Sequence, residues 1–296
     1  MKIGEIAALS AAFCWTINAL LLESVGKRTN IHKTNFMRLI LGLILISFYT
    51  LFTKNMFLPV DASLKTVLFL SLSGLIGFAI GDYFLIRSMV TVGTRIAMLM
   101  MATSPIMTAI IDFLVYKEKL TVYNLLGIAL TLIGIAMVII YQKQNDDLDG
   151  RKNLFAGIFF GFLGALGQAV GLIFSKIGMG DYDAFQATQI RIMAGILAII
   201  IMQLFSGNIK VIFEKLEKRS DFLKLVGAGI LGPFVGVGLS LLALQYTSAG
   251  IAATLTTTMP IMVLPISIFF FKEKINMGEI IGTLISILGI AILFLF

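Results

Sequence analysis

Long apolar runs alternate with short polar breaks along the whole chain. Ten runs can be counted, and each is long enough for a helix that crosses a hydrocarbon core of about 30 Å, which takes about 20 residues. The pattern predicts an all-α integral membrane protein with ten transmembrane helices. The runs cover about residues 3–22, 35–53, 66–87, 95–115, 121–141, 154–175, 184–205, 222–245, 251–271 and 278–296.

The second half of the chain repeats the first. Residues 74–141 align without a gap on residues 229–296 at one constant shift (260 − 105 = 155), and 17 of the 68 columns are identical. The polar segment 142–153 reads as a linker, so we expect one five-helix repeat at 1–142 and a second at 152–296. Because five is an odd number, the second repeat enters the bilayer from the opposite side, and the two copies form inverted repeats. In transporters such repeats place the substrate site near the midplane.

Composition agrees with a membrane protein. Only 13% of the residues are charged, against about 25% in a soluble domain, and the mean hydropathy is +1.00. The net charge of +7 lies mostly in loops, so topology and anionic lipid explain it better than nucleic acid does. One cysteine and one histidine provide too few ligands for a metal site, and we expect no cofactor. Glu5 interrupts the signal-peptide pattern of the first 22 residues, so we expect a retained helix.

The orientation predicted from loop charge is unusual. With the amino terminus outside the cell, the cytoplasmic loops would hold 15 Lys and Arg residues and the opposite loops six. The positive-inside rule therefore predicts that both termini face away from the cytoplasm.

Two carboxylates within the apolar runs are the sharpest functional signal. Charged residues at this depth are costly and are usually paired or face water. Asp82 and Asp112 occupy positions that hold Val237 and Ser267 in the second copy, so the acidic pair breaks the repeat and is a candidate for coupling or for binding a substrate amine. Alternatively, Asp112 reaches the interface, and Asp82 pairs with an arginine such as Arg87.

The second and seventh runs each keep an arginine near their start, Arg38 and Arg191. Each either extends to the membrane surface or serves as a counter-ion for buried carboxylates or substrate. Uncharged polar and aromatic side chains within the runs either contact another helix or line a cavity. These weaker candidates are Trp15, Asn18, Tyr83, Gln168 and Gln245.

Glycine and proline are spaced for helix packing and for kinks. The glycine sets at 74, 77 and 81 and at 229, 232 and 236 put small residues on one helix face, which favours close packing. Pro105 and Pro260 lie within runs, where each removes a hydrogen bond, so we expect kinks that shape or gate a cavity. Pro265 has no counterpart in the first copy, where Ile110 stands.

The repeat resembles a known family. The segment from Gln245 to Ala253, then Met259-Pro260-Ile261 and Lys272-Glu273-Lys274, is similar to the signature half of the EamA-type transporters of the drug/metabolite transporter superfamily. The first copy, from Gly81-Asp82 through Pro105 and Glu118, looks like the same signature. The resemblance implies a ten-helix exporter or exchanger of amino acids, other small metabolites or drugs. It also implies that both termini are cytoplasmic, which contradicts the loop charge.

The sequence therefore predicts a non-enzymatic secondary active transporter in a bacterial or archaeal inner membrane, working by alternating access around a midplane cavity. It would carry a small-molecule substrate, coupled to protons or to a counter-substrate, as a monomer or homodimer. No nucleotide-binding loop is found, so ATP is not the expected driver. The alternatives are a membrane enzyme acting on lipid, for which only Asp82 and Asp112 are available, and a non-transporting sensor or scaffold.

Overall fold

The computed structural model describes residues 3–116, 121–141, 148–247, 249–271 and 276–295. The two Lys-Glu-Lys motifs and most of the expected linker lie outside these ranges. Every regular element among the described residues is a helix. The first half contains α1 (Ile3–Gly26), α2 (Ile31–Lys54), α3 (Leu64–Gly74), the π-helix η1 (Leu75–Gly81), α4 (Asp82–Val92), α5 (Thr94–Met101), α6 (Ser104–Tyr116) and α7 (Val122–Tyr141). The second half contains α8 (Leu148–Met179), α9 (Ala184–Phe205), α10 (Lys210–Phe213), α11 (Arg219–Gly229), the π-helix η2 (Ile230–Gly236), α12 (Val237–Tyr246), α13 (Ala249–Thr256), α14 (Met259–Phe271) and α15 (Met277–Leu295).

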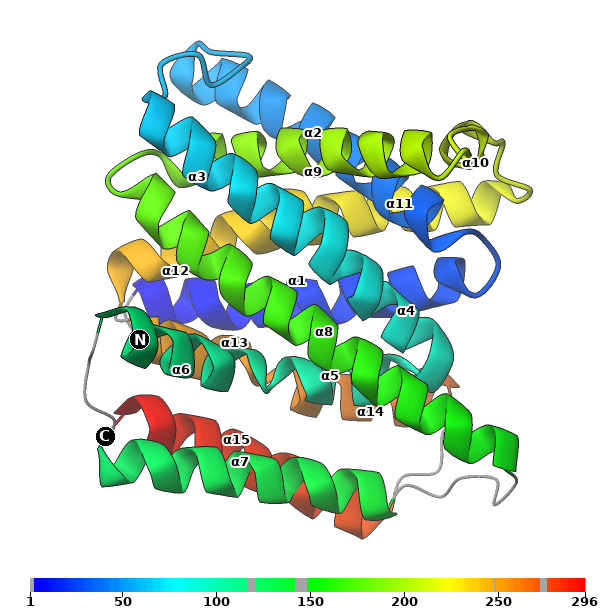
Figure 1. Cartoon of the computed structure of the whole chain (residues 1–296), viewed down its shortest axis with the longest axis vertical. Coiled ribbons are helices and arrows are strands. Elements are labelled where there is room, and N and C mark those ends of the chain that lie inside the picture. The colour runs from blue at the N-terminus through cyan, green and yellow to red at the C-terminus, as the bar shows by residue number, and fades with distance from the viewer. Residues whose placement is uncertain (1–2, 117–120, 142–147, 248, 272–275, 296) are drawn as a thin grey trace.

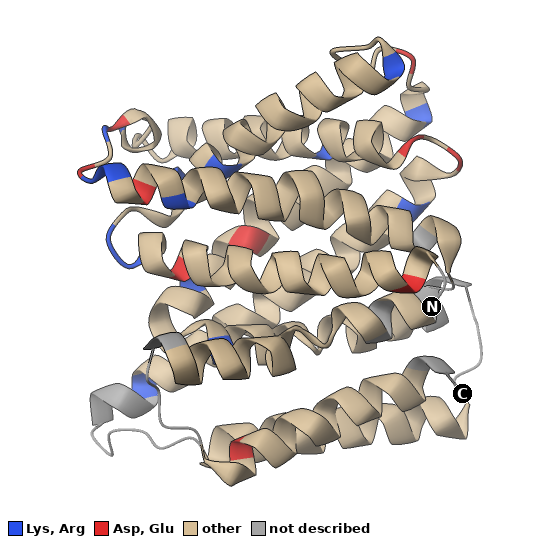
Figure 2. Cartoon of the chain, turned by 180° about the vertical axis from the view of Figure 1, so that it is seen from behind, with Lys and Arg blue, Asp and Glu red and all other residues tan. Residues whose placement is uncertain are grey.

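Most of the helices have the length and the apolar composition of membrane-spanning segments. In the described chain, eight helical segments are long and apolar enough to cross a bilayer, and two shorter apolar helices, Met259–Phe269 and Met277–Leu293, follow them. Lys, Arg, Asp and Glu gather toward the two ends of the helices and are sparse between them (Figure 2). The chain is thus an all-α, multi-pass membrane protein.

The repeat seen in the sequence recurs element by element. The two π-helices begin 155 residues apart (230 − 75 = 155), as do α5 and α13 (249 − 94 = 155). The second helix of each half follows a slightly different shift, because α9 begins 153 residues after α2 (184 − 31 = 153). Arg38 and Arg191 share this second shift (191 − 38 = 153), so they occupy equivalent positions.

The equivalent helices α7 and α15 lie side by side at one edge of the molecule and run in opposite directions (Figure 1). Their contacts are reciprocal. A Cβ on Gly127 would lie 2.6 Å from the carbonyl oxygen of Gly289, and a Cβ on Gly134 would lie 2.4 Å from that of Gly282. Since Gly127 matches Gly282 and Gly134 matches Gly289, the pair obeys a pseudo-two-fold axis. This is the relation that inverted repeats require.

The two halves exchange helices at the centre. Helix α8 packs along α3, η1 and α4 of the first half, and α1 packs along α11, η2 and α12 of the second. Helix α9 crosses α3 and η1, whereas α2 crosses α11 and η2. Each π-helix is therefore enclosed by helices of the other half, so any site beside it is built from both repeats.

Glycines permit these close approaches, as the sequence predicts. A Cβ on Gly74 would lie 2.0 Å from the carbonyl oxygen of Arg191, and one on Gly81 would lie 3.3 Å from the backbone of Gly167. The sequence does not predict the π-helices themselves. Their wider turn lets the amide of Asp82 bond to the carbonyl of Gly77, five residues earlier.

Two prolines lie just after short interruptions of their apolar runs. The fourth run is divided into α5 and α6, and Pro105 is the second residue of α6. Pro260 has the same position at the start of α14. Proline is tolerated in a first turn because its missing N–H would have no helical partner there. Pro265, in contrast, lies inside its helix, α14, and Pro233 lies inside η2.

Candidate functional site

A buried ion pair lies where η1 ends. Asp82, the first residue of α4, is 1% exposed, and its Oδ2 is paired with the Nη2 of Arg38 on α2. A charge buried in a membrane needs such a partner. Arg38 is buried as well, so it does not extend to the membrane surface. Asp82 is not paired with Arg87, whose Nη1 donates to the hydroxyl of Tyr83 at 2.8 Å.

Further hydrogen bonds fix Arg38. Its Nη2 also donates to the Asn35 Oδ1 at 2.8 Å, and the Asn35 Nδ2 donates to the carbonyl oxygen of Phe78 at 2.6 Å. Asn35 and Arg38 are three residues apart on α2, so both side chains lie on the same helix face. The guanidinium is therefore held against the π-helix through Asn35.

Gln168 brings the second repeat into this group. Its Nε2, on α8, donates to the Asp82 Oδ1 at 2.8 Å and to the Gly77 carbonyl oxygen at 3.2 Å. Each oxygen of Asp82 thus accepts from a different half of the chain, Oδ2 from Arg38 and Oδ1 from Gln168. We call Asn35, Arg38, Asp82 and Gln168 the Asp82 centre.

Arg191, on α9, lies beside the Asp82 centre without joining its hydrogen bonds. It is 5% exposed, and its Cζ lies 4.8 Å from the centroid of the Phe78 ring, within the range of a cation–π contact. Its charge acts on Asp82 electrostatically, but the two make no ion pair. In the described part of the chain, its Nε is buried with no hydrogen-bond partner.

Comparison with known proteins shows the family of the chain. The profile of the EamA-like transporter family matches residues 2–140 and again residues 155–295, which together cover most of the chain. The chain belongs to the EamA-like transporter family. It is therefore a protein of a transporter family, located in the cell membrane and built from two EamA units.

Relatives agree with this assignment. An uncharacterized transporter of Archaeoglobus fulgidus is 24% identical over 300 residues, which cover 98% of this chain and 97% of the relative. An uncharacterized transporter of Clostridium kluyveri is 24% identical over 221 residues, covering 75% of this chain and 70% of the relative. One solved crystal structure has the same fold, with a TM-score of 0.66 at 15% identity over 99% of this chain and 96% of that one.

The two EamA units differ at the position of Asp82 and around it. The second unit has Val237 at the position of Asp82, and this valine packs in an apolar cluster with Trp15. The Trp15 Nε1 donates to the Ser240 Oγ at 3.3 Å. Asn18 is buried against Gly232, and its Oδ1 has no hydrogen-bond partner among the described residues. The second centre is therefore neutral, whereas the first is charged.

Three residues suggested by the sequence are not found at the Asp82 centre. Tyr83 stacks on His32, with ring centroids 4.5 Å apart, and so faces away from Asp82. Gln245 is exposed near the end of α12. Asp112 belongs to α6, but its side chain lies outside the part of the chain that the structure describes.

Sequence reasoning missed a second buried ion pair that joins the EamA units. The Arg95 Nη1, on α5, lies 3.2 Å from the Glu279 Oε2 on α15, and Glu279 is 2% exposed. Glu279 also accepts from the backbone amide of Asn276 and thus caps its own helix. No local sequence pattern predicts this pair, since its members are far apart in the chain.

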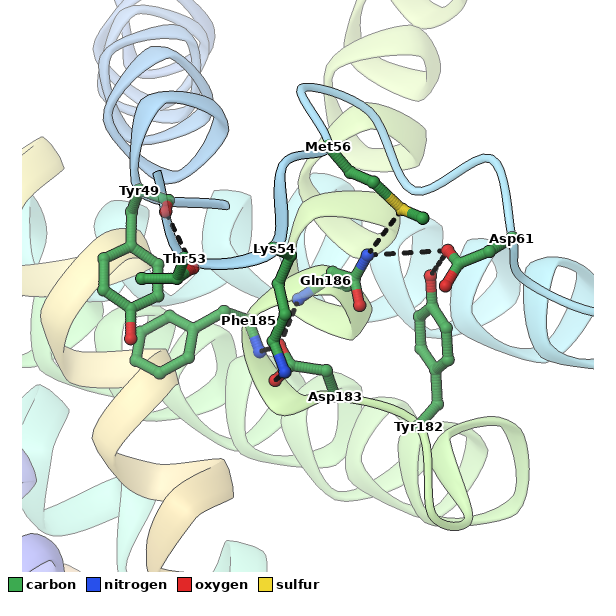
Figure 3. A network of polar contacts seen from close by, with 9 residues as sticks. All are labelled: Tyr49, Thr53, Lys54, Met56, Asp61, Tyr182, Asp183, Phe185 and Gln186. Atoms are coloured by element: carbon green, nitrogen blue, oxygen red, sulfur yellow. Dashed lines mark hydrogen bonds and ion pairs between the residues drawn. The ribbon is translucent and has the colours of Figure 1, made fainter. Parts of the chain in front are cut away.

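A polar network joins the units at the end where α2 meets α3 (Figure 3). The Tyr182 hydroxyl, between α8 and α9, donates to the Asp61 Oδ1 at 2.6 Å, and the Lys54 Nζ lies 3.1 Å from the Asp183 Oδ2. Asp183 also caps α9 by accepting from the backbone amides of Phe185 and Gln186 at 3.0 and 3.1 Å. We call Lys54, Asp61, Tyr182 and Asp183 the end network. Burial and the neighbouring Asp61 raise the pKa of Tyr182, so its hydroxyl stays protonated.

Proposed function

We propose that this protein is a secondary active transporter, an exporter or exchanger of small metabolites such as amino acids, that works by alternating access around the Asp82 centre. The observation that supports this most directly is that both oxygens of one buried carboxylate are bonded, one from each EamA unit. Any rocking of residues 1–142 against residues 152–296 must strain or break the bond from Gln168. The centre is therefore sensitive to the motion that alternating access requires.

Coupling follows from the chemistry of Asp82. A proton on Asp82, or a counter-substrate beside it, weakens its attraction to Arg38 and so changes the energy of the arrangement in which Gln168 is bonded. A ligand shifts a conformational equilibrium only through such a difference between the two states. In this proposal, Asp82 is the coupling residue, Arg38 its counter-ion and Gln168 the contact that senses the other unit.

The broken helices are suited to move. The breaks before Pro105 and Pro260 lie at the same place in each unit. At each break, a threonine hydroxyl donates a hydrogen bond to a backbone carbonyl of the preceding helix. The Thr103 Oγ1 donates to the Met100 carbonyl at 2.6 Å, and the Thr258 Oγ1 donates to the Leu255 carbonyl at 2.7 Å. We propose these breaks as hinges, with Pro265 shaping the second one. Trp15 and Asn18 line the neutral centre of the second unit, beside Ser240 and Gly232.

The end network is proposed as a closed gate. It ties the α2–α3 connection of one unit to the α8–α9 connection of the other through an ion pair and a hydrogen bond. At the opposite end, a hollow of about 380 Å³ lies between the start of α2 and the end of α9. Its polar lining includes Asn30, His32, Gln203 and Ser206. Opening the first end would require Lys54 and Tyr182 to release their partners.

A transport assay tests this proposal. The full chain would be reconstituted in liposomes that are preloaded with a mixture of amino acids, and release would be followed with and without a proton gradient and with external amino acids. We expect Asp82→Asn to abolish gradient-driven or exchange flux while the protein remains folded. Asp181→Asn, at an exposed loop position, is the matched control. Unchanged flux in Asp82→Asn would contradict the role of Asp82.

A further inference from the structure

The charges around the Asp82 centre do not balance. Two guanidinium groups and one carboxylate lie there, and their residues are 1% exposed for Arg38, 1% for Asp82 and 5% for Arg191. Arginine stays protonated in proteins. Among the side chains that the structure describes at this centre, one positive charge therefore has no negative partner.

Both oxygens of Asp82 are bonded within the protein, whereas no hydrogen bond of Arg191 is found among the described residues. The Asp82 oxygens accept from Arg38 and Gln168, and Asp82 is 1% exposed. Arg191 makes no hydrogen bond within the described chain, its Nε is buried without a partner there, and its guanidinium lies over the face of the Phe78 ring. A guanidinium carries five N–H donors in a planar fork that matches a carboxylate. The unpaired charge is therefore the one on Arg191.

There is room beside Arg191 for a ligand atom. A Cβ on Gly77 would lie 3.7 Å from the Arg191 Nη2, 3.9 Å from the Gln168 Oε1 and 4.0 Å from the Gly171 Cα, all ordinary contacts. The neighbouring Gly74 differs, because a Cβ there would lie 2.0 Å from the backbone oxygen of Arg191. Gly77 thus leaves space for one atom, with a donor, Arg191, on one side and an acceptor, the Gln168 Oε1, on the other.

We propose that Arg191 binds the carboxylate of the transported substrate in the space next to Gly77. This inference rests on the proposed transport function and specifies its substrate class as carboxylate-bearing metabolites. The carboxylate supplies the missing negative charge, and the Gln168 Oε1 accepts a hydrogen bond from a neighbouring donor on the substrate. Because Gln168 also bonds to Asp82, the substrate and the coupling residue share one side chain.

Trp15 provides a natural reporter for this site. It is the only tryptophan in the chain, and it packs against the apolar cluster that contains Phe78, whose ring faces Arg191. Its fluorescence would be followed in the full protein in lipid nanodiscs, together with the unfolding temperature. The probes are lactate, pyruvate, benzoate and the common L-amino acids, each paired with its carboxamide.

We expect at least one acid of the panel to bind and its carboxamide to bind more weakly. Arg191→Gln should weaken binding of the acid about 10- to 100-fold, the range expected for loss of a charge-assisted hydrogen bond, and should leave acid and amide equal. Arg191→Lys should restore part of the difference, because it keeps the charge without the fork. Arg87→Gln is the matched control, since Arg87 is exposed.

Gly77→Ala tests the same space without removing a charge. Its methyl group fits the backbone but occupies the space beside Arg191, so we expect folding to be retained and the affinity for the acid to fall. The inference is overturned if no carboxylate binds, if carboxamides bind as well as acids, or if Arg191→Gln keeps the preference for acids. Coupled flux of an amide or a cation that does not depend on Arg191 would overturn it while leaving the transport proposal intact. Absence of coupled flux for every solute would instead remove the transport proposal.

Discussion

Arg38 and Arg191 occupy equivalent positions, each seven residues after the first residue of its helix, yet only Arg38 is paired with a carboxylate. Their surroundings explain the difference. Arg38 meets Asp82 at the end of η1, whereas Arg191 lies one turn earlier along the same π-helix, beside Phe78 and Gly77. Both halves of the repeat thus direct an arginine toward one centre, the one that carries the acid.

The first prediction concerns the stability of this centre. Arg38→Gln leaves the Asp82 carboxylate buried without a counter-ion, and we expect a loss of about 3–5 kcal/mol, as for other broken buried ion pairs. Arg191→Gln should cost less, because Arg191 has no hydrogen bond in the described chain to lose. The double variant Arg38→Gln with Asp82→Asn should regain most of the loss. Chemical unfolding in detergent measures all three, and equal losses for the two arginines would contradict the assignment.

The second prediction compares Gly77 of η1 with Gly74, the last residue of α3. Gly74→Ala forces a Cβ into the backbone of Arg191, so we expect a loss of about 3 kcal/mol or a failure to fold. Gly77→Ala introduces only ordinary contacts and should cost less than about 1 kcal/mol. The yield of folded protein and its unfolding midpoint distinguish the two. Similar behaviour of both variants would mean that the space next to Gly77 is filled.

Much of this architecture could be predicted from the sequence because it depends on local patterns. Apolar length indicates the membrane helices, and the alignment of the two copies gives the equivalence of η1 with η2 and of Pro105 with Pro260. The comparison of copies also singles out Asp82, since a valine stands at its counterpart. The length of an apolar run and the repetition of a segment can both be recognised from the order of residues alone, so no tertiary information is needed to predict them.

The sequence offers Arg38 as a counter-ion for a buried carboxylate, as the structure shows, but it does not specify that Asp82 is the partner. Arg38 is 44 residues away and Gln168 is 86 residues away, so their contacts depend on how α2 and α8 cross η1. The π-helices were also missed, because a run of glycines and apolar residues does not distinguish an α-helical turn from a wider one. The extent of each interruption before a proline cannot be predicted either, because the run stays apolar on both sides of it.

The third prediction tests the end network as a gate. Asp61→Cys and Tyr182→Cys would be combined in a chain whose single native cysteine, Cys14, is replaced by serine. A short bis-methanethiosulfonate reagent, which links the two thiols through disulfides, should join the two units and stop transport, because alternating access requires these connections to separate. A reductant that cleaves the disulfides should restore transport. Either single cysteine variant, treated identically, is the control. Full transport in the cross-linked protein would show that this end does not open.

The fourth prediction concerns the titration of Tyr182. Burial, the hydrogen bond to Asp61 and the negative charges of Asp61 and Asp183 raise its pKa above the usual 10.0. A raised pKa in the folded state means that the stabilisation from the protonated hydroxyl is complete below pH 10 and is lost as the pH rises through the folded-state pKa. The tyrosinate absorbance of the native protein, minus that of Tyr182→Phe, should therefore show a tyrosine that titrates above pH 10. If gating depends on this contact, Tyr182→Phe should open the end network at neutral pH, and raising the pH of the unmodified protein to 9 should not. A tyrosine that ionises below pH 10 in the difference spectrum would contradict the contact with Asp61.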